Sequence, residues 1–176
     1  MQVLEQPRSC DPRQFSGILQ LYGERGLARL QASHVVVAGI GGVGSWAAEA
    51  LVRSGIGRIS LIDMDHISVS NINRQVHALH STLGASKIEV MAERLRDIRP
   101  DMDVQLIDDF LTLDNLEQRL EFSFDGFIDA IDQVSVKAAL IAYLHRRATP
   151  MVVCGAAGGR VDPLLLKAQD LAFTTQ

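Results

Sequence analysis

Four glycines, Gly39, Gly41, Gly42 and Gly44, form a G-x-G-G-x-G run, a pattern typical of backbone that binds phosphate groups. Three valines precede the run and an apolar helical segment follows it, which predicts a buried strand, a tight turn and a helix. Gly39 permits the turn, Gly41 lets a ligand approach the backbone, and Gly44 lets the helix pack against the strand. The N–H groups and the positive dipole end of that helix, which starts near Ser45, would then face the phosphates.

An acidic residue at the end of the next strand supports nucleotide binding. Residues 58–63 read RISLID and predict a second buried strand, whose last residue, Asp63, lies roughly 20 residues beyond the glycine run. A carboxylate at this place usually accepts hydrogen bonds from a ribose. A glycine run alone also fits a merely structural turn, but the strand, the helix and the acid together favour a nucleotide site.

Polar side chains crowd the segment that follows this strand. A second acid, Asp65, is followed by Asn71, Asn73, Arg74 and Gln75 among apolar neighbours. Beside a nucleotide, amides can bind ribose and base, and a guanidinium can hold phosphate oxygens as a fork. The alternative interpretation is a surface loop in which an asparagine caps a turn.

The next helix carries a lysine in its first turn. Apolar residues at helical spacing predict an amphipathic helix over residues 85–98, with Lys87 near its start. A cation is unfavourable at a helix N-terminus by about 0.3–1 kcal/mol, so this lysine indicates an anionic partner. An ordinary exposed lysine is the alternative interpretation.

Two later strands also end in acids. They are predicted over residues 104–107 and 126–131; two aspartates follow the first, and the second carries Asp129 and Asp132. Ligands of open parallel α/β sheets bind at the carboxyl ends of the strands. One of these acids could hold Mg²⁺ through a bound nucleotide, because Mg²⁺ takes one or two carboxylates plus phosphate oxygens. Any single aspartate is also a common helix cap.

The remaining patterns supply the scaffold that positions these residues. They predict a fifth strand over 151–154, a short strand over 164–167, a short helix over 113–120 and a helix over 136–147 that Ser135 caps. The predicted fold class is therefore α/β, a Rossmann-like, doubly wound, mostly parallel sheet with an N-terminal helical arm.

The chain divides into an arm, residues 1–33, and a nucleotide-binding domain, residues 34–176. In the arm, apolar residues at near-helical spacing are interrupted by three glycines, which predicts short helical turns. In the domain, the buried face of the helix after the glycine run is predicted to consist of its apolar residues, Trp46, Ala47, Ala50 and Leu51.

Composition limits the function classes. The 176-residue chain has a formal net charge of −4, which gives no general attraction for nucleic acid. Neither Cys10 nor Cys154 has a CxxC partner, so no zinc site is expected, and Cys154 reads as a packing residue. The histidines at 66, 77 and 80 are spaced too irregularly for a metal site. No signal peptide or membrane segment is recognisable, and the expected compartment is the cytoplasm.

Five motifs occur in order between residues 35 and 132: GIGGVGS, LIDMD, SNINRQ, GASK and FIDAID. In this order and spacing they resemble the ubiquitin-activating-enzyme-like (E1-like, ThiF-type) adenylating family. Longer stretches are similar to one subgroup, the bacterial tRNA threonylcarbamoyladenosine dehydratases: GSWAAEALVRSGIG, NRQVHAL, KIEVMAERLRDIRP and KAALIAYLHRRATP. Composition alone could not supply that substrate.

The resemblance implies an enzyme that uses ATP to adenylate a carboxylate, that of N6-threonylcarbamoyladenosine in tRNA, which then cyclises by dehydration. The implied cofactors are ATP and Mg²⁺. The four glycines would line the phosphates, Asp63 would bind the ribose, and the triphosphate would contact Asn71, Arg74 and Lys87. Asp132 would contact ATP through Mg²⁺. The implied catalytic residues are Arg74, Lys87 and Asp132.

The resemblance also implies a homodimer and a tRNA substrate, with a sulfur-relay or carrier protein as a further candidate partner. The alternatives are activation of a sulfur-carrier protein, an NAD-dependent oxidoreductase and a non-catalytic nucleotide-binding module. The chain departs from the family at Gln14 and Gln20, which stand where arginines usually reach into the partner's site. It is also expected to lack the crossover loop and the region of the reactive cysteine.

Overall fold

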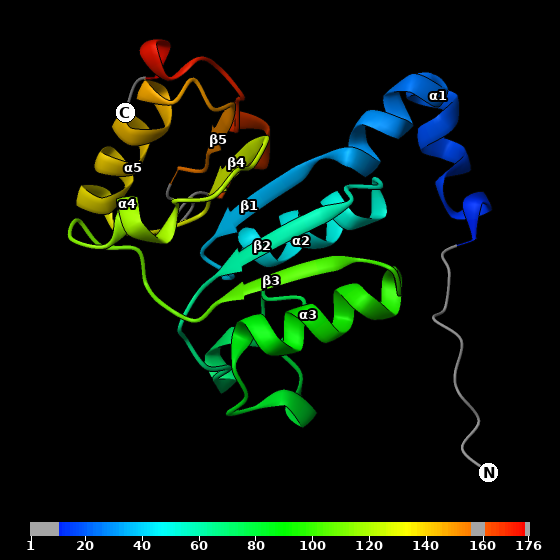
Figure 1. Cartoon of the computed structure of the whole chain (residues 1–176). Helices are drawn as coiled ribbons and strands as arrows, with labels where there is room; N and C mark the ends of the chain where they lie inside the picture. Colours follow the sequence, from blue (N-terminus) through cyan, green and yellow to red (C-terminus); the bar gives the residue numbers. More distant parts are fainter. Residues whose placement is uncertain (1–10, 156–160, 175–176) are drawn as a thin grey trace.

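A five-stranded sheet forms the centre of the computed structural model, which describes residues 11–155 and 161–174 (Figure 1). The sheet order is β3-β2-β1-β4-β5, and every neighbouring pair is parallel. Because the strand order reverses between β1 and β4, the sheet has the switch point of a doubly wound fold, which confirms the predicted fold class. The strands are β1 (His34–Ala38), β2 (Arg58–Ile62), β3 (Asp103–Ile107), β4 (Gly126–Asp129) and β5 (Met151–Val153).

Helices connect the strands. The α-helices are α1 (Ser16–Ala32), α2 (Gly44–Arg53), α3 (Lys87–Ile98), α4 (Leu116–Arg119) and α5 (Val134–Arg146). The short 3₁₀ helices are η1 (Pro12–Phe15), η2 (Val69–Asn71), η3 (His80–Thr82), η4 (Pro163–Leu165) and η5 (Leu171–Phe173). Within the described residues, none of the helices is both long enough and apolar enough to cross a membrane.

The two faces of the sheet bury separate apolar clusters, because successive residues of a strand point to opposite faces. In β1, Val37 packs in a cluster with residues of α2 and α3, whereas Val36 and Ala38 pack in a cluster with residues of α4 and α5. Helices therefore cover both faces of the sheet (Figure 1). The carboxyl ends of the strands are left to the loops that carry the predicted site residues.

The arm stands beyond the end of the sheet at which the strands begin (Figure 1). Of its three glycines, only Gly23 interrupts the helix, with φ of 70° and ψ of 175°. Phe15 fixes the base of the arm, because it is buried and lies under the guanidinium of Arg99, 5.4 Å from the ring centre. Leu21 and Tyr22 are exposed. Residues 1–10 of the predicted arm lie outside the described part of the chain.

The predicted inner face of α2 is wrong. Trp46 is 55% exposed, and Ala50 is also exposed. The buried face repeats at helical spacing and includes two polar residues: Ser45, Ala48, Glu49 and Val52. Polar side chains can occupy this face because they are hydrogen-bonded there, so apolar character alone pointed to the wrong side of the helix.

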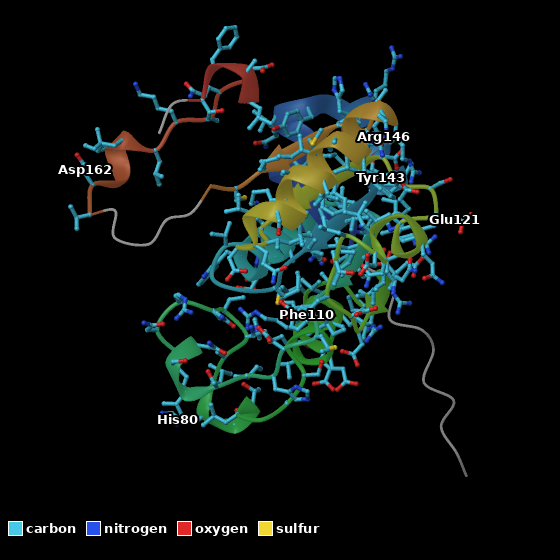
Figure 2. All side chains as sticks on the ribbon, turned by 90° about the vertical axis from the view of Figure 1, so that its left-hand side faces the viewer. His80, Phe110, Glu121, Tyr143, Arg146 and Asp162 are labelled. Carbon is cyan, nitrogen blue, oxygen red and sulfur yellow. The ribbon has the colours of Figure 1, made fainter. Side chains whose placement is uncertain are left out.

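Three other predicted elements differ from the structure. Residues 164–167 form no strand; η4 overlaps them, and Figure 2 shows Asp162 on a segment that stands apart from the sheet. α5 begins at Val134, so Ser135 lies inside the helix and does not cap it. Only four residues of the predicted helix over 113–120 are helical, because the side chain of Asn115 accepts a hydrogen bond from the Thr112 N–H and forms a turn instead.

Candidate nucleotide-binding site

The glycine turn between β1 and α2 is shaped by close backbone contacts. Gly39 has φ of +86°, and a Cβ placed on it would lie 2.6 Å from the carbonyl oxygen of Ala130. A Cβ on Gly44 would overlap the carbonyl oxygen of Gly39. Since real Cβ atoms do not approach closer than about 3.0 Å, both positions require glycine whether or not a ligand is bound.

Gly41 differs from these two glycines because the protein leaves space around it. The nearest atom to a Cβ placed there would be Nε2 of Gln75, 4.0 Å away. The N-cap of α2, Val43, makes no side-chain capping hydrogen bond, so this helix end is open to an anion. The prediction that a ligand approaches Gly41 is therefore compatible with the geometry.

Asp63 holds the glycine turn in place from the end of β2. It is 6% exposed, its Oδ2 accepts a hydrogen bond from the N–H of Ile40 at 2.6 Å, and its Oδ1 accepts one from the N–H of Asp65 at 2.8 Å. Each oxygen keeps a second lone pair for another donor. Ribose binding by Asp63 stays a prediction, and the structure adds a positioning role that the sequence did not indicate.

Arg74 lies against the glycine turn. A Cβ on Gly42 would come within 3.2 Å of Cγ and Cδ of Arg74, so the aliphatic part of the arginine crosses the glycine. Nη1 of Arg74 donates to the carbonyl oxygen of Ser70 at 2.8 Å, and its own carbonyl oxygen accepts from Nε1 of Trp46 at 2.9 Å. The exposed Trp46 thus holds the backbone of this loop against α2.

Asn71 shapes the same loop from inside. It is 7% exposed, and its Oδ1 accepts a hydrogen bond from the N–H of Ser68 at 2.9 Å. This contact closes the short helix η2 and leaves the amide nitrogen of Asn71 as the donor that can face a ligand. Both the turn-capping interpretation and a position near the nucleotide are consistent with this geometry.

Lys87 is not an ordinary surface lysine. It lies in the first turn of α3, as predicted, although the helix begins at Lys87 and not at residue 85, and it is only 6% exposed. Its Nζ lies 2.6 Å from Oδ2 of Asp65, and its backbone N–H donates to the carbonyl oxygen of Asp65 at 3.0 Å. The alternative of a solvated lysine is therefore wrong, because this ammonium is buried and paired.

Asp132 lies at the carboxyl end of β4, in the loop between β4 and α5, and it is exposed. Its neighbour Asp129 is 1% exposed; it accepts a hydrogen bond from the N–H of Ile131 at 3.0 Å and lies 2.7 Å from Nζ of Lys137. The described residues contain no group of three or more histidine, cysteine or acidic side chains that could hold a metal ion. Metal binding by Asp132 stays a prediction that needs phosphate oxygens as additional ligands.

A profile of the ThiF family matches residues 13–170. The chain belongs to the ThiF family. It is 52% identical over 164 residues to the tRNA threonylcarbamoyladenosine dehydratase of Escherichia coli and 40% identical over 161 residues to that of Bacillus subtilis. These matches cover 93% and 92% of this chain but 61% and 63% of the relatives, so the chain spans less than two thirds of their length.

Solved structures give the same assignment for the fold of this ThiF-family chain. The crystal structure of the E. coli dehydratase TcdA superposes with a TM-score of 0.90, covering 93% of this chain and 69% of that one. A crystal structure of the same protein in complex with ATP superposes with a TM-score of 0.89, covering 92% of this chain and 67% of that one. The predicted E1-like, ThiF-type resemblance is confirmed.

This chain also buries a carboxylate, that of Glu49, which was not predicted from the sequence. Glu49 of α2 accepts hydrogen bonds from Nε of Arg53 at 2.9 Å and from Nε of Arg94 of α3 at 2.5 Å. Although burial alone would raise the pKa of Glu49, the two guanidinium groups hold it below its usual value. This bridge joins the helix of the glycine turn to the helix of Lys87. The i,i+4 pair of Glu49 and Arg53 was the sequence signal.

His77 and Cys154 are buried to different extents. His77 is 1% exposed, and burial, with the nearby charges of Lys87 and Arg94, lowers its pKa to about 4. Burial raises the pKa of the half-buried Cys154 thiol, which agrees with a packing role and not with a nucleophile. Both side chains are therefore uncharged at neutral pH.

Proposed function

We propose that this chain is the nucleotide-binding part of an enzyme that adenylates the carboxylate of N6-threonylcarbamoyladenosine in tRNA with ATP. The activated carboxylate would then cyclise, with net dehydration. The name of the similar E. coli and B. subtilis proteins and the ATP complex of TcdA support this proposal.

The observation that carries the proposal is a backbone turn with space at Gly41 and two cationic residues connected to it. The stem of Arg74 crosses Gly42, and Lys87 connects to the same turn through Asp65 and Asp63. A triphosphate brings several negative charges into such a site, and two fixed cations can offset them.

The chemistry needs little from the protein beyond orientation and charge. A carboxylate oxygen attacks the α-phosphorus, the bond to the bridging oxygen of the β-phosphate breaks, and pyrophosphate leaves. Arg74 and Lys87 offset the charge that develops on the transferring and leaving phosphates. In the second step a nucleophile within the threonylcarbamoyl group attacks the activated carbonyl carbon, and this new bond closes the ring. AMP leaves and carries away one oxygen of the original carboxylate.

Asp132 is the residue that would hold Mg²⁺, together with phosphate oxygens. Its position fits, because its carboxylate is exposed at the carboxyl end of β4, the strand beside β1 in the sheet. The ion, when bound, supplies positive charge to the leaving pyrophosphate. The chain's own residues would bind and orient the nucleotide.

A calorimetric titration tests the nucleotide. ATP with Mg²⁺ should bind, and NAD should bind far more weakly, because a triphosphate offers more negative charge to Arg74 and Lys87 than a dinucleotide's diphosphate does. Preference for NAD would contradict the proposal and favour the oxidoreductase alternative. A protein that binds ATP but exchanges pyrophosphate with a carrier protein in place of tRNA would favour the sulfur-carrier alternative.

We also propose that two copies pair through their arms and work in the cytoplasm, where a tRNA substrate is available. Leu21 and Tyr22 of α1 are 69% and 59% exposed, and the pairing would cover them. Gln14 holds the arm to the core, because its Nε2 donates to the carbonyl oxygen of Ile98 at 2.7 Å, so it is not free to replace a reaching arginine. A sulfur-relay protein is a further partner to test. Sedimentation at micromolar concentration should give the mass of a dimer; the mass of a monomer would contradict the pairing.

A further inference from the structure

Asp65 contacts both the backbone N–H and the side-chain ammonium of Lys87. Its carbonyl oxygen accepts the backbone N–H of Lys87 at 3.0 Å, and its carboxylate lies 2.6 Å from the ammonium. The two side chains differ in exposure, because 7% of the lysine side chain and 53% of the aspartate side chain are accessible. Asp65 therefore lies on the open side of the pair, where a ligand would enter.

Burial makes the carboxylate necessary to the ammonium. An ammonium that is removed from water without a counter-ion loses several kcal/mol of solvation, so an unpaired Lys87 side chain would not keep this buried position. The buried imidazole of His77 cannot replace the carboxylate, since it is neutral at pH 7. Asp65 therefore holds the Lys87 side chain in place in the protein without nucleotide.

Asp65 is also linked to the glycine turn. Its backbone N–H donates to Oδ1 of Asp63, whose Oδ2 accepts the N–H of Ile40. The position of the Lys87 ammonium is therefore fixed relative to the turn by a continuous chain of hydrogen bonds.

We propose that Asp65 is a positioning residue that holds the Lys87 ammonium ready for an entering triphosphate and does not bind the nucleotide itself. The proposal rests on the proposed adenylation function. When phosphates arrive, Lys87 is shared between them and Asp65. The carboxylate then has two opposed effects on ATP affinity, because it orders a favourable cation and also repels the phosphates.

A double-mutant cycle in the full-length protein tests this role. In the parent protein, Asp65→Asn should lower the adenylation rate roughly tenfold while ATP affinity changes less than about threefold, since the two opposed effects nearly cancel in binding. In Lys87→Ala protein, Asp65→Asn should leave the rate unchanged and tighten ATP binding about fivefold, because only repulsion remains. Asp65→Glu should recover part of the rate.

The matched control is Asp103→Asn. Asp103 is a 63% exposed aspartate that pairs with Arg58 at 3.2 Å, at the end of the sheet where the strands begin. This variant should keep both the rate and the affinity of the parent protein.

Several results would overturn the proposal. They are an unchanged rate in Asp65→Asn, a loss of ATP affinity as large as the loss of rate, or the same effect of Asp65→Asn with and without Lys87. The affinity half of the cycle needs no tRNA, so it still decides the role of Asp65 if threonylcarbamoylated tRNA fails to drive the reaction and the proposed function falls.

Discussion

The candidate residues at the carboxyl ends of β2 and β4 are held differently by the protein. On the side of β1 and β2, Asp63 and Lys87 are both less than 10% exposed, and each makes short contacts to its neighbours. On the side of β4 and α5, Asp132 is exposed, while the buried pair of Asp129 and Lys137 holds the turn behind it. The first side is held by short contacts within the protein, and the second presents an exposed carboxylate.

This difference distinguishes two aspartates, Asp63 and Asp132, that have similar positions in the sequence pattern. The acids at the ends of β2 and β4 follow the same strand-end pattern, yet Asp63 orders the protein and Asp132 is free of that task. Substitutions on the side of β1 and β2 should therefore change stability and ATP binding together. Substitutions on the side of β4 and α5 should change only what happens when nucleotide and metal are present.

The largest expected effect is at Lys87. Lys87→Ala should lower the adenylation rate by roughly 10²–10³, the order seen on removal of one preorganised charge-stabilising group, with a smaller loss of ATP affinity. Lys87→Arg should recover little, because a planar guanidinium does not fit the place of a compact ammonium. Lys167→Ala, at an exposed lysine, is the control. A Lys87→Ala protein with the rate of the parent would show that Lys87 does not assist adenylation.

The next effect separates two glycines of the same turn. Gly44→Ala should lower the free energy of unfolding by about 2–3 kcal/mol, because its Cβ overlaps the Gly39 carbonyl oxygen and the backbone must shift. Gly41→Ala should leave that free energy nearly unchanged and weaken ATP binding, since only a ligand contests the space. Urea unfolding and ATP titration measure the two quantities. Equal loss of stability in both variants would show that the turn leaves no space for a ligand at Gly41.

A pair of aspartate substitutions compares the two sides directly. Asp63→Ala should give a folded protein that is less stable, because two backbone donors lose their acceptor. The same variant should bind ATP more weakly by about 1–3 kcal/mol. Asp132→Ala should unfold at the same temperature as the parent without nucleotide and lose stabilisation by ATP with Mg²⁺. Thermal unfolding with and without nucleotide gives both results. The comparison fails if Asp132→Ala alone lowers the unfolding temperature of the nucleotide-free protein.

The last expected effect is a pH dependence on the side of β1 and β2. The pKa of buried His77 is about 4, below the value of about 6.5 of an unfolded chain, so the unfolded state binds more protons between these values. Stability should fall on acidification through this window by up to about 1.4 kcal/mol per pH unit. His77→Gln should reduce the slope, and His80→Gln, at an exposed histidine, should not. Equal slopes in parent and His77→Gln protein would contradict the assignment.

The sequence was sufficient for the five-stranded sheet, and the candidate site that it indicated stays a prediction. Strand-end acids, the glycine run and the lysine at the start of α3 follow from patterns that are local in the chain. The sequence was not sufficient where a contact joins distant segments: Glu49 reaches Arg94 and Lys87 reaches Asp65 only after the helices pack. The wrong inner face of α2 has the same origin, because a buried glutamate is stable only with partners that a local pattern does not include.

Pyrophosphate exchange into ATP tests the central claim most directly. The full-length protein is mixed with ATP, Mg²⁺ and labelled pyrophosphate, with or without tRNA that carries N6-threonylcarbamoyladenosine. Label should enter ATP only when the modified tRNA is present, because exchange requires the reversible adenylation of its carboxylate. Equal exchange with unmodified tRNA, or none with the modified tRNA while ATP binds, would contradict the proposed reaction.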